Sequence, residues 1–144
     1  MGNSKAFVQT ACICENVLFD KDNVASIIRI VDRFDVEVPD NLPPDLPFGF
    51  PITMFIRVKF ADPKTSGLIS VQAKRPDGTL GGRQNIPIPE GDHDGAQFKT
   101  IFNILKPQSG MYWFDVLWDN EPITSVPMTV VIKHTQAPGA TRQS

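Results

Sequence analysis

Gly110–Ile132, GMYWFDVLWDNEPITSVPMTVVI, is the stretch that decides the fold of this chain. It contains two segments in which apolar and polar side chains alternate, joined by the polar turn Asp119–Pro122. Successive side chains of a strand point to opposite faces, so the alternation predicts two strands with one apolar face each. The apolar sets are Tyr112, Phe114, Val116 and Trp118, then Val126, Met128, Val130 and Ile132. A hairpin of this kind is typical of the end of an immunoglobulin-like sandwich.

The same alternation recurs in the segments that precede this hairpin. Ile52–Phe60 is the most regular, and Leu68–Lys74 and Ala96–Leu105 follow the same pattern. The apolar run Val24–Val38 exceeds the usual length of a strand, so we expect a bend or bulge near Asp32, where a charge interrupts it. No segment shows a helical period. The sequence therefore predicts an all-β fold, a single antiparallel immunoglobulin-like β-sandwich of seven or eight strands.

The length of 144 residues is that of one domain. Residues 1–134 are expected to form the sandwich, and residues 135–144 have the polar composition of a disordered tail. The segment Pro39–Pro51 contains five prolines and is predicted to be an extended loop. Its apolar side chains indicate that it lies against the domain.

The composition argues against two broad classes of partner. The formal net charge is −2, and no block of Lys or Arg could neutralise a row of phosphates, so no nucleic-acid binding is expected. No segment approaches the roughly 20 consecutive apolar residues of a membrane-spanning helix, so no membrane partner is expected. The N-terminus lacks the apolar centre of a secretory signal. We expect a cytoplasmic protein.

Cys12 and Cys14 are the only cysteines. Two residues apart on a strand, they project from the same face with Cα atoms about 6.5 Å apart, which is at the far limit for a disulfide. The redox and metal spacing Cys-x-x-Cys is absent. The sequence therefore predicts two buried thiols in a reducing compartment, and no cofactor.

Groups suited to catalysis or metal binding are few. His93 lies in the acidic loop Glu90–Gly95, and no Ser or Cys stands in a recognisable nucleophile setting near either histidine, so we expect no enzyme. Asp92, His93 and Asp94 could together hold a divalent ion at the surface, but acidic turns between strands are common without a ligand. The sequence thus predicts no metal site and leaves these three residues as its only candidates.

Apolar side chains on the outward register of the strands suggest an interaction surface. If the Tyr112 set faces the core, then Trp113, Leu117 and Val131 face outward, and Phe55 has the outward register on its own strand. Large aromatic rings in such positions are favoured at protein interfaces. The alternative is that the proline-rich loop or the N-terminal strand covers this patch.

The order of the segments resembles a family of small bacterial β-sandwich domains of unknown function. The shared marks are Cys14-Glu15-Asn16-Val17 with Asp20, the stretch Ile27–Phe34, and a closing Tyr-x-Phe-x-Val-x-x-Asp at Tyr112, Phe114, Val116 and Asp119. They span roughly residues 6–132. The resemblance implies a bacterial or phage origin and the sandwich fold, and it implies no activity.

Three functions remain open from the sequence. The first is a non-enzymatic protein-binding or adaptor domain that acts through an outer sheet face or edge, with a protein partner or a second copy of itself. The second is a ligand- or ion-binding module that uses the loops around Asp92–Asp94 and Asp20–Asp22. The third is a structural subunit of a phage particle or secretion assembly.

Overall fold

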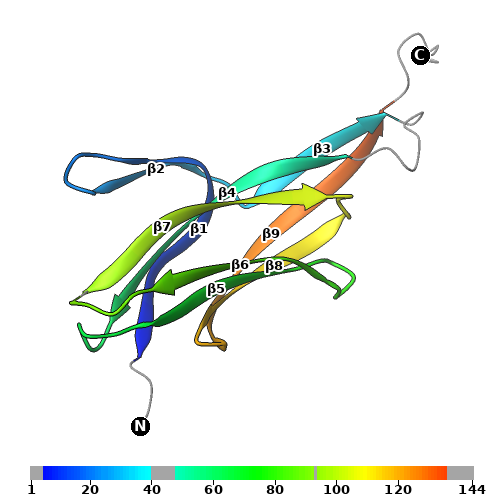
Figure 1. The fold of residues 1–144 in the computed structure, drawn as a ribbon. Coiled ribbons are helices and arrows are strands. Elements are labelled where there is room, and N and C mark those ends of the chain that lie inside the picture. Colours follow the sequence, from blue (N-terminus) through cyan, green and yellow to red (C-terminus); the bar gives the residue numbers. More distant parts are fainter. Residues whose placement is uncertain (1–4, 40–47, 93, 136–144) are drawn as a thin grey trace, which may run out of the picture.

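The computed structural model describes residues 5–39, 48–92 and 94–135, which form two packed β-sheets (Figure 1). The strands of this described part are β1 (Ala6–Phe19), β2 (Ala25–Ile30), β3 (Arg33–Pro39), β4 (Gly49–Phe60), β5 (Gly67–Lys74), β6 (Leu80–Ile88), β7 (Gly95–Leu105), β8 (Gly110–Trp118) and β9 (Glu121–Thr135). One sheet has the order β2-β1-β4-β7 and the other the order β3-β9-β8-β5-β6. The predicted fold class, an all-β immunoglobulin-like sandwich, is confirmed.

Two details of the fold differ from the prediction. The described residues form nine strands rather than seven or eight, and β3 pairs with β9 in parallel, so the sandwich is not purely antiparallel. Both differences arise in the run Val24–Val38. It breaks at Val31–Asp32, and its halves join opposite sheets, β2 beside β1 and β3 beside β9. The interruption expected near Asp32 is therefore a change of sheet.

The core lies between the two sheets and is built from the alternate residues that the sequence placed inward. Phe114, Val116 and Met128 are fully buried on β8 and β9, facing Met54 and Ile56 of β4. Aromatic pairs join the layers. The ring centroids of Phe102 and Phe114 are 5.3 Å apart, and those of Phe60 and Trp118 are 5.2 Å apart. In the described part of the chain no helix has the length and apolar character needed to cross a membrane.

The start of β8 carries a tyrosine corner, a hallmark of immunoglobulin-like sandwiches. Tyr112 is buried, and its hydroxyl oxygen accepts a hydrogen bond of 2.9 Å from the backbone N–H of Gln108, four residues upstream. Gly110 between them has φ +133°, and a Cβ there would lie 2.8 Å from Cβ of Pro76. This corner fixes how the chain enters β8, and hence the register of the strand that carries Trp113.

We expect Tyr112→Phe to lower the free energy of unfolding by about 1–2 kcal/mol, because it removes the hydroxyl and leaves the Gln108 N–H without its acceptor. Urea unfolding would give this difference. Amide exchange should become faster at Gln108 than at core amides such as that of Met128. Unchanged stability together with unchanged exchange at Gln108 would show that the corner is not a stabilising contact.

Two predicted segments fall partly outside the described residues. β9 runs to Thr135, one residue past the expected end of the sandwich, and the rest of the expected tail lies outside the described part. Of the proline-rich loop, residues 40–47 are likewise not described. The end of that segment belongs to β4, where the ring of Phe50 lies 5.4 Å from that of Phe34.

Candidate interaction surfaces

The outer face of the five-stranded sheet carries three of the four residues predicted to face outward. Trp113 of β8 is 39% exposed, beside Met111 at 45% and opposite the exposed Pro127 of β9. Leu117 and Val131 have the same outward register and are half-buried. We call these five residues the Trp113 surface.

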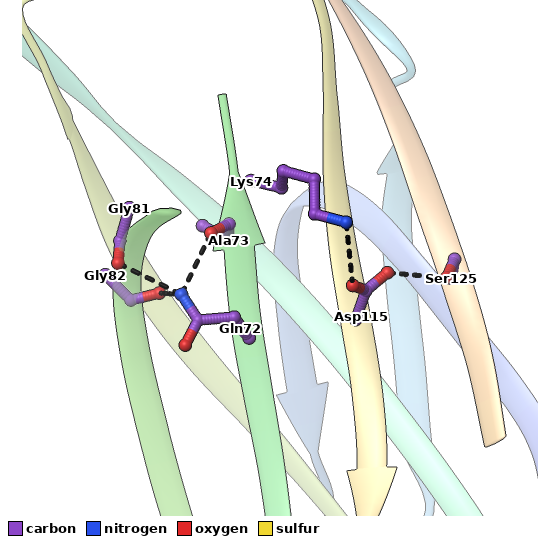
Figure 2. Close-up of polar contacts among 7 residues, drawn as sticks. All are labelled: Gln72, Ala73, Lys74, Gly81, Gly82, Asp115 and Ser125. Carbon is purple, nitrogen blue, oxygen red and sulfur yellow. Dashed lines mark hydrogen bonds and ion pairs between the residues drawn. The ribbon is translucent and has the colours of Figure 1, made fainter. Parts of the chain in front are cut away.

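A row of paired polar groups crosses β9, β8, β5 and β6, in the sheet that also carries Trp113 (Figure 2). Asp115 of β8 accepts a hydrogen bond of 2.6 Å from the Ser125 hydroxyl on β9, and its other oxygen lies 3.9 Å from Nζ of Lys74 on β5. Further along β5, the amide nitrogen of Gln72 is shared among the backbone oxygens of Ala73 (2.9 Å), Gly81 (3.1 Å) and Gly82 (3.3 Å). These contacts join β9, β8, β5 and β6, so they hold these polar side chains in fixed positions across the sheet.

Phe55 does not belong to this surface, which corrects the prediction. It lies on β4 in the four-stranded sheet, so it faces the opposite side of the sandwich, and it is only 2% exposed. It packs in a small cluster with Cys14 and Val17, and its ring lies 6.3 Å from that of Phe19. The register of Phe55 was predicted correctly, but another part of the chain covers that face.

The cover is a hairpin formed by residues 14–30, the end of β1 with β2. It is fastened to β7 by two contacts: Lys99 Nζ donates to the carbonyl of Val17 at 3.4 Å, and the Gln97 side-chain amide donates to the carbonyl of Asn23. In Figure 1 the hairpin, coloured blue, extends sideways from the rest of the sandwich. Its inward-facing side chains Cys14, Val17 and Ile27 cover Phe55.

The side of the hairpin that faces away from Phe55 is exposed and apolar. Its residues are Leu18 (53% exposed), Val24 (57%), Ile28 (38%) and Ile30 (69%). We call these four residues the hairpin surface. The exposure of this surface was not predicted, because Val24, Ile28 and Ile30 are apolar and spaced as in a strand with a buried face. The adjacent pair Ile27–Ile28 was the available signal, since it puts an isoleucine on both faces of one strand.

The two thiols lie at the base of this hairpin and are free, as predicted, although only one of the two is buried as expected. Cys14 is buried and Cys12 half-buried in the cluster around Phe55. Burial raises the pKa of both thiols, and their mutual contact raises that of Cys12 further. Thiols with raised pKa values are protonated near neutral pH and are weak nucleophiles.

The predicted acidic loops come together only in part. Asp22 and Asp94 line one open cleft of about 500 Å³ with Arg57, Lys59 and Gln97. Asp92 is exposed, and His93 lies outside the described residues. In the described part of the chain no three His, Cys, Asp or Glu side chains are grouped to hold a metal ion.

The polar groups near this cleft already bind within the chain. The carboxylate of Asp20 accepts the backbone N–H groups of Asp22 and Val24, at 2.8 and 3.0 Å, so it closes the hairpin turn. Arg57 donates through Nε to Gln9 and through Nη1 to Gln97, both at 2.8 Å. Asp20 therefore has a structural role in the hairpin turn, and Arg57 has one on the surface of the sheet.

One carboxyl group in the described residues has a depressed pKa, and its role is structural. The hydroxyl and backbone N–H of Thr79, with the side chain of Gln108, hold the pKa of Asp77 below its usual value. Asp77 sits in the turn between β5 and β6, and its two oxygens thereby tie this turn to the loop before β8. The shift reflects turn formation.

The chain is similar to one described family and to solved structures. Residues 9–131 match a family described as a family of unknown function (DUF6941). No curated protein matches the chain. Among solved structures, it is similar to the CARDB domain of a Pyrococcus furiosus protein in complex with di-metal ions, with 13% identity, 91% and 96% of the two chains covered and a TM-score of 0.49. It is also similar to an immunoglobulin-like protein from Pseudomonas aeruginosa, with 9% identity, 90% and 99% covered and a TM-score of 0.46.

Proposed function

The chain belongs to the family of unknown function DUF6941, and we propose that it is a non-enzymatic protein-binding or adaptor domain. Its partner is a protein that contacts the Trp113 surface. The two free thiols support a reducing compartment such as the cytoplasm as the place where it works. An adaptor of this kind needs no reactive groups, only a rigid face with an anchor.

The observation that carries the proposal is the position of Trp113 on that face. Its ring stands in the middle of a sheet, with neighbouring strands on both sides, and it is flanked by the apolar side chains of Met111 and Pro127. Tryptophan supplies a large contact area while losing little conformational freedom on binding, and it is enriched among residues that dominate binding energy. A single ring of this kind can anchor a contact.

The polar row beside Trp113 supports a specific contact rather than general stickiness. Asp115 is paired with Ser125 and Lys74, so a partner meets polar groups that are already satisfied and oriented. Apolar anchors surrounded by ordered polar groups are typical of the centre and rim of protein interfaces. The partner should therefore offer an apolar recess for the ring and neutral polar groups around it.

The two alternatives receive less support. An ion-binding module would need the acidic loops, but Asp20 already closes its own turn and the described residues contain no metal-ligating group of three. No specific observation favours a structural subunit of a phage particle or secretion assembly. The binding domain is the function that the geometry supports best.

Trp113→Asp is expected to weaken binding of the partner by about 30-fold or more, because loss of an aromatic anchor removes about 2 kcal/mol or more. Tagged wild-type and variant protein would be used as baits in lysate of the source organism, and the affinity for the captured protein measured by calorimetry. Ile101→Asp is the matched control, since Ile101 is exposed on β7 in the other sheet. A partner retained equally by wild type and Trp113→Asp would refute the assignment of this surface.

A further inference from the structure

Three of the sheet edges in the described structure, those of β7, β3 and β2, differ in how well they are protected from pairing with another strand. The edge of β7 is covered at Ile101, whose carbonyl accepts the side-chain amide of Gln84 from β6. The edge strand β3 carries charges at alternate positions, Arg33, Asp35 and Glu37. Edge strands are commonly guarded against unwanted pairing by coverage or charge of this kind.

The edge of β2 is the least protected of these three, because no described strand covers it and its single charge, Arg29, is paired within the hairpin. β2 pairs only with β1 among the described strands, and its sequence, Ala-Ser-Ile-Ile-Arg-Ile, contains no proline, lysine or acid. Ile28 and Ile30 are exposed on it, and Leu18 and Val24 extend the apolar area. A free strand edge presents a row of backbone donors and acceptors that only another extended chain can pair throughout. The occupant of this edge is therefore a β-strand with apolar side chains.

The charge pattern identifies which strand fits. The only charge of β2, Arg29, is paired at 2.8 Å with Glu15 of the same hairpin. A surface that meets its own copy across a two-fold axis sets each charge near its like, so it must be neutral or internally paired. The hairpin surface meets this condition. A second β2 strand also has the required properties, since it is extended, apolar and electrically balanced.

We propose that two copies of this chain associate through their hairpin surfaces, with β2 antiparallel to β2 of the second copy. The two four-stranded sheets then join into one continuous sheet, and the exposed side chains of Val24, Ile28 and Ile30 are buried between the copies. This interface is separate from the Trp113 surface, which remains free on each copy. The association closes at two copies because a two-fold contact uses the single β2 edge of each copy.

The geometry also sets the strength of the association. Arg29 has φ +49°, which ends the regular part of the strand at Ile28 and leaves a short segment for pairing. A short pairing segment with a few apolar side chains falls at the small end of specific interfaces, for which dissociation constants in the micromolar range are common. The dimer should thus form reversibly over concentrations of roughly 5–500 µM.

Sedimentation velocity of the full chain over this concentration range tests the proposal. Wild type should shift from monomer to dimer, whereas Ile28→Asp and Ile30→Asp should bind at least about tenfold more weakly, because each places a charge from both copies in an apolar interface. Leu105→Asp, at an exposed position on β7, is the control and should dimerise as wild type does. Circular dichroism would establish that all variants keep the wild-type fold.

Amide exchange detects the strand pairing directly. The variant Trp113→Asp separates self-association through the hairpin surface from partner binding through the Trp113 surface. Amide exchange in Ala25–Ile28 should slow as wild-type concentration rises, while that of β6 stays constant. Trp113→Asp should dimerise normally, whatever it does to the partner. A wild type that remains monomeric at about 500 µM would overturn the inference, as would dimerisation that survives both hairpin variants. Loss of the dimer in Trp113→Asp alone would assign self-association to the Trp113 surface instead.

Discussion

Phe114→Ala should destabilise the protein by about 3–5 kcal/mol, the range measured for truncating a fully buried phenylalanine. Phe114 is 0% exposed in the middle of β8, and its ring packs against Phe102 across the two layers of the sandwich. Alanine would leave a cavity that β8 cannot close, because neighbouring strands hold it on both sides. Equilibrium unfolding in urea would show a lower midpoint with an unchanged slope.

Phe114→Leu is the matched comparison, because it removes the ring but fills part of the space. Its loss of stability should lie well below that of Phe114→Ala. A change of less than about 1 kcal/mol for alanine would mean that β8 is not at the centre of the core. That result would contradict the register on which the outward position of Trp113 depends.

Phe55→Ala should have a large effect of a different kind, because Phe55 holds the hairpin against the four-stranded sheet. It packs against Cys14 and Val17, which belong to the hairpin, so truncation should cost about 3 kcal/mol or more. Amide exchange in β2 should accelerate far more than in β4 or β7, since local opening needs only the hairpin contacts to break. Urea unfolding together with residue-resolved exchange would separate the global loss from the local one.

Phe7→Ala is the control for this variant. Phe7 lies on the outer side of β1 but is 54% exposed, so its loss should change stability by no more than about 0.5 kcal/mol. If Phe55→Ala accelerated amide exchange evenly throughout the protein, the hairpin would not open independently of the rest of the fold. Weaker dimerisation of Phe55→Ala is also expected, because the pairing edge would no longer be held in place.

The sequence predicted the part of the fold that depends on which way a side chain points from its own strand. The alternation in Gly110–Ile132 correctly placed Phe114 and Met128 inward and Trp113 outward. It could not predict what lies on the outward side. Phe55 has an outward register just as Trp113 does. The hairpin covers Phe55, whereas Trp113 on the other sheet is exposed. Coverage depends on contacts between distant segments, and alternation does not record them.

The hairpin surface was missed for a related physical reason. In Val24–Val38 the apolar side chains recur as they do in a core strand, but the chain changes sheets at Asp32. The pattern holds for β3, where Phe34 and Val36 pack against the core. It fails for β2, where Ile28 and Ile30 face solvent. The apolar alternation therefore correctly indicated a strand in both β2 and β3. It correctly indicated a buried face only in β3.

Site-directed photocrosslinking tests the central claim, a protein contact at the Trp113 surface, most directly. The photoreactive residue p-benzoylphenylalanine would be placed at position 113 and, as the control, at position 101 on the other sheet, and the protein irradiated in lysate of the source organism. We expect one protein adduct at position 113 and none at position 101, with excess unlabelled wild type suppressing the adduct. Absence of an adduct at 113, or the same adducts at both positions, would contradict it.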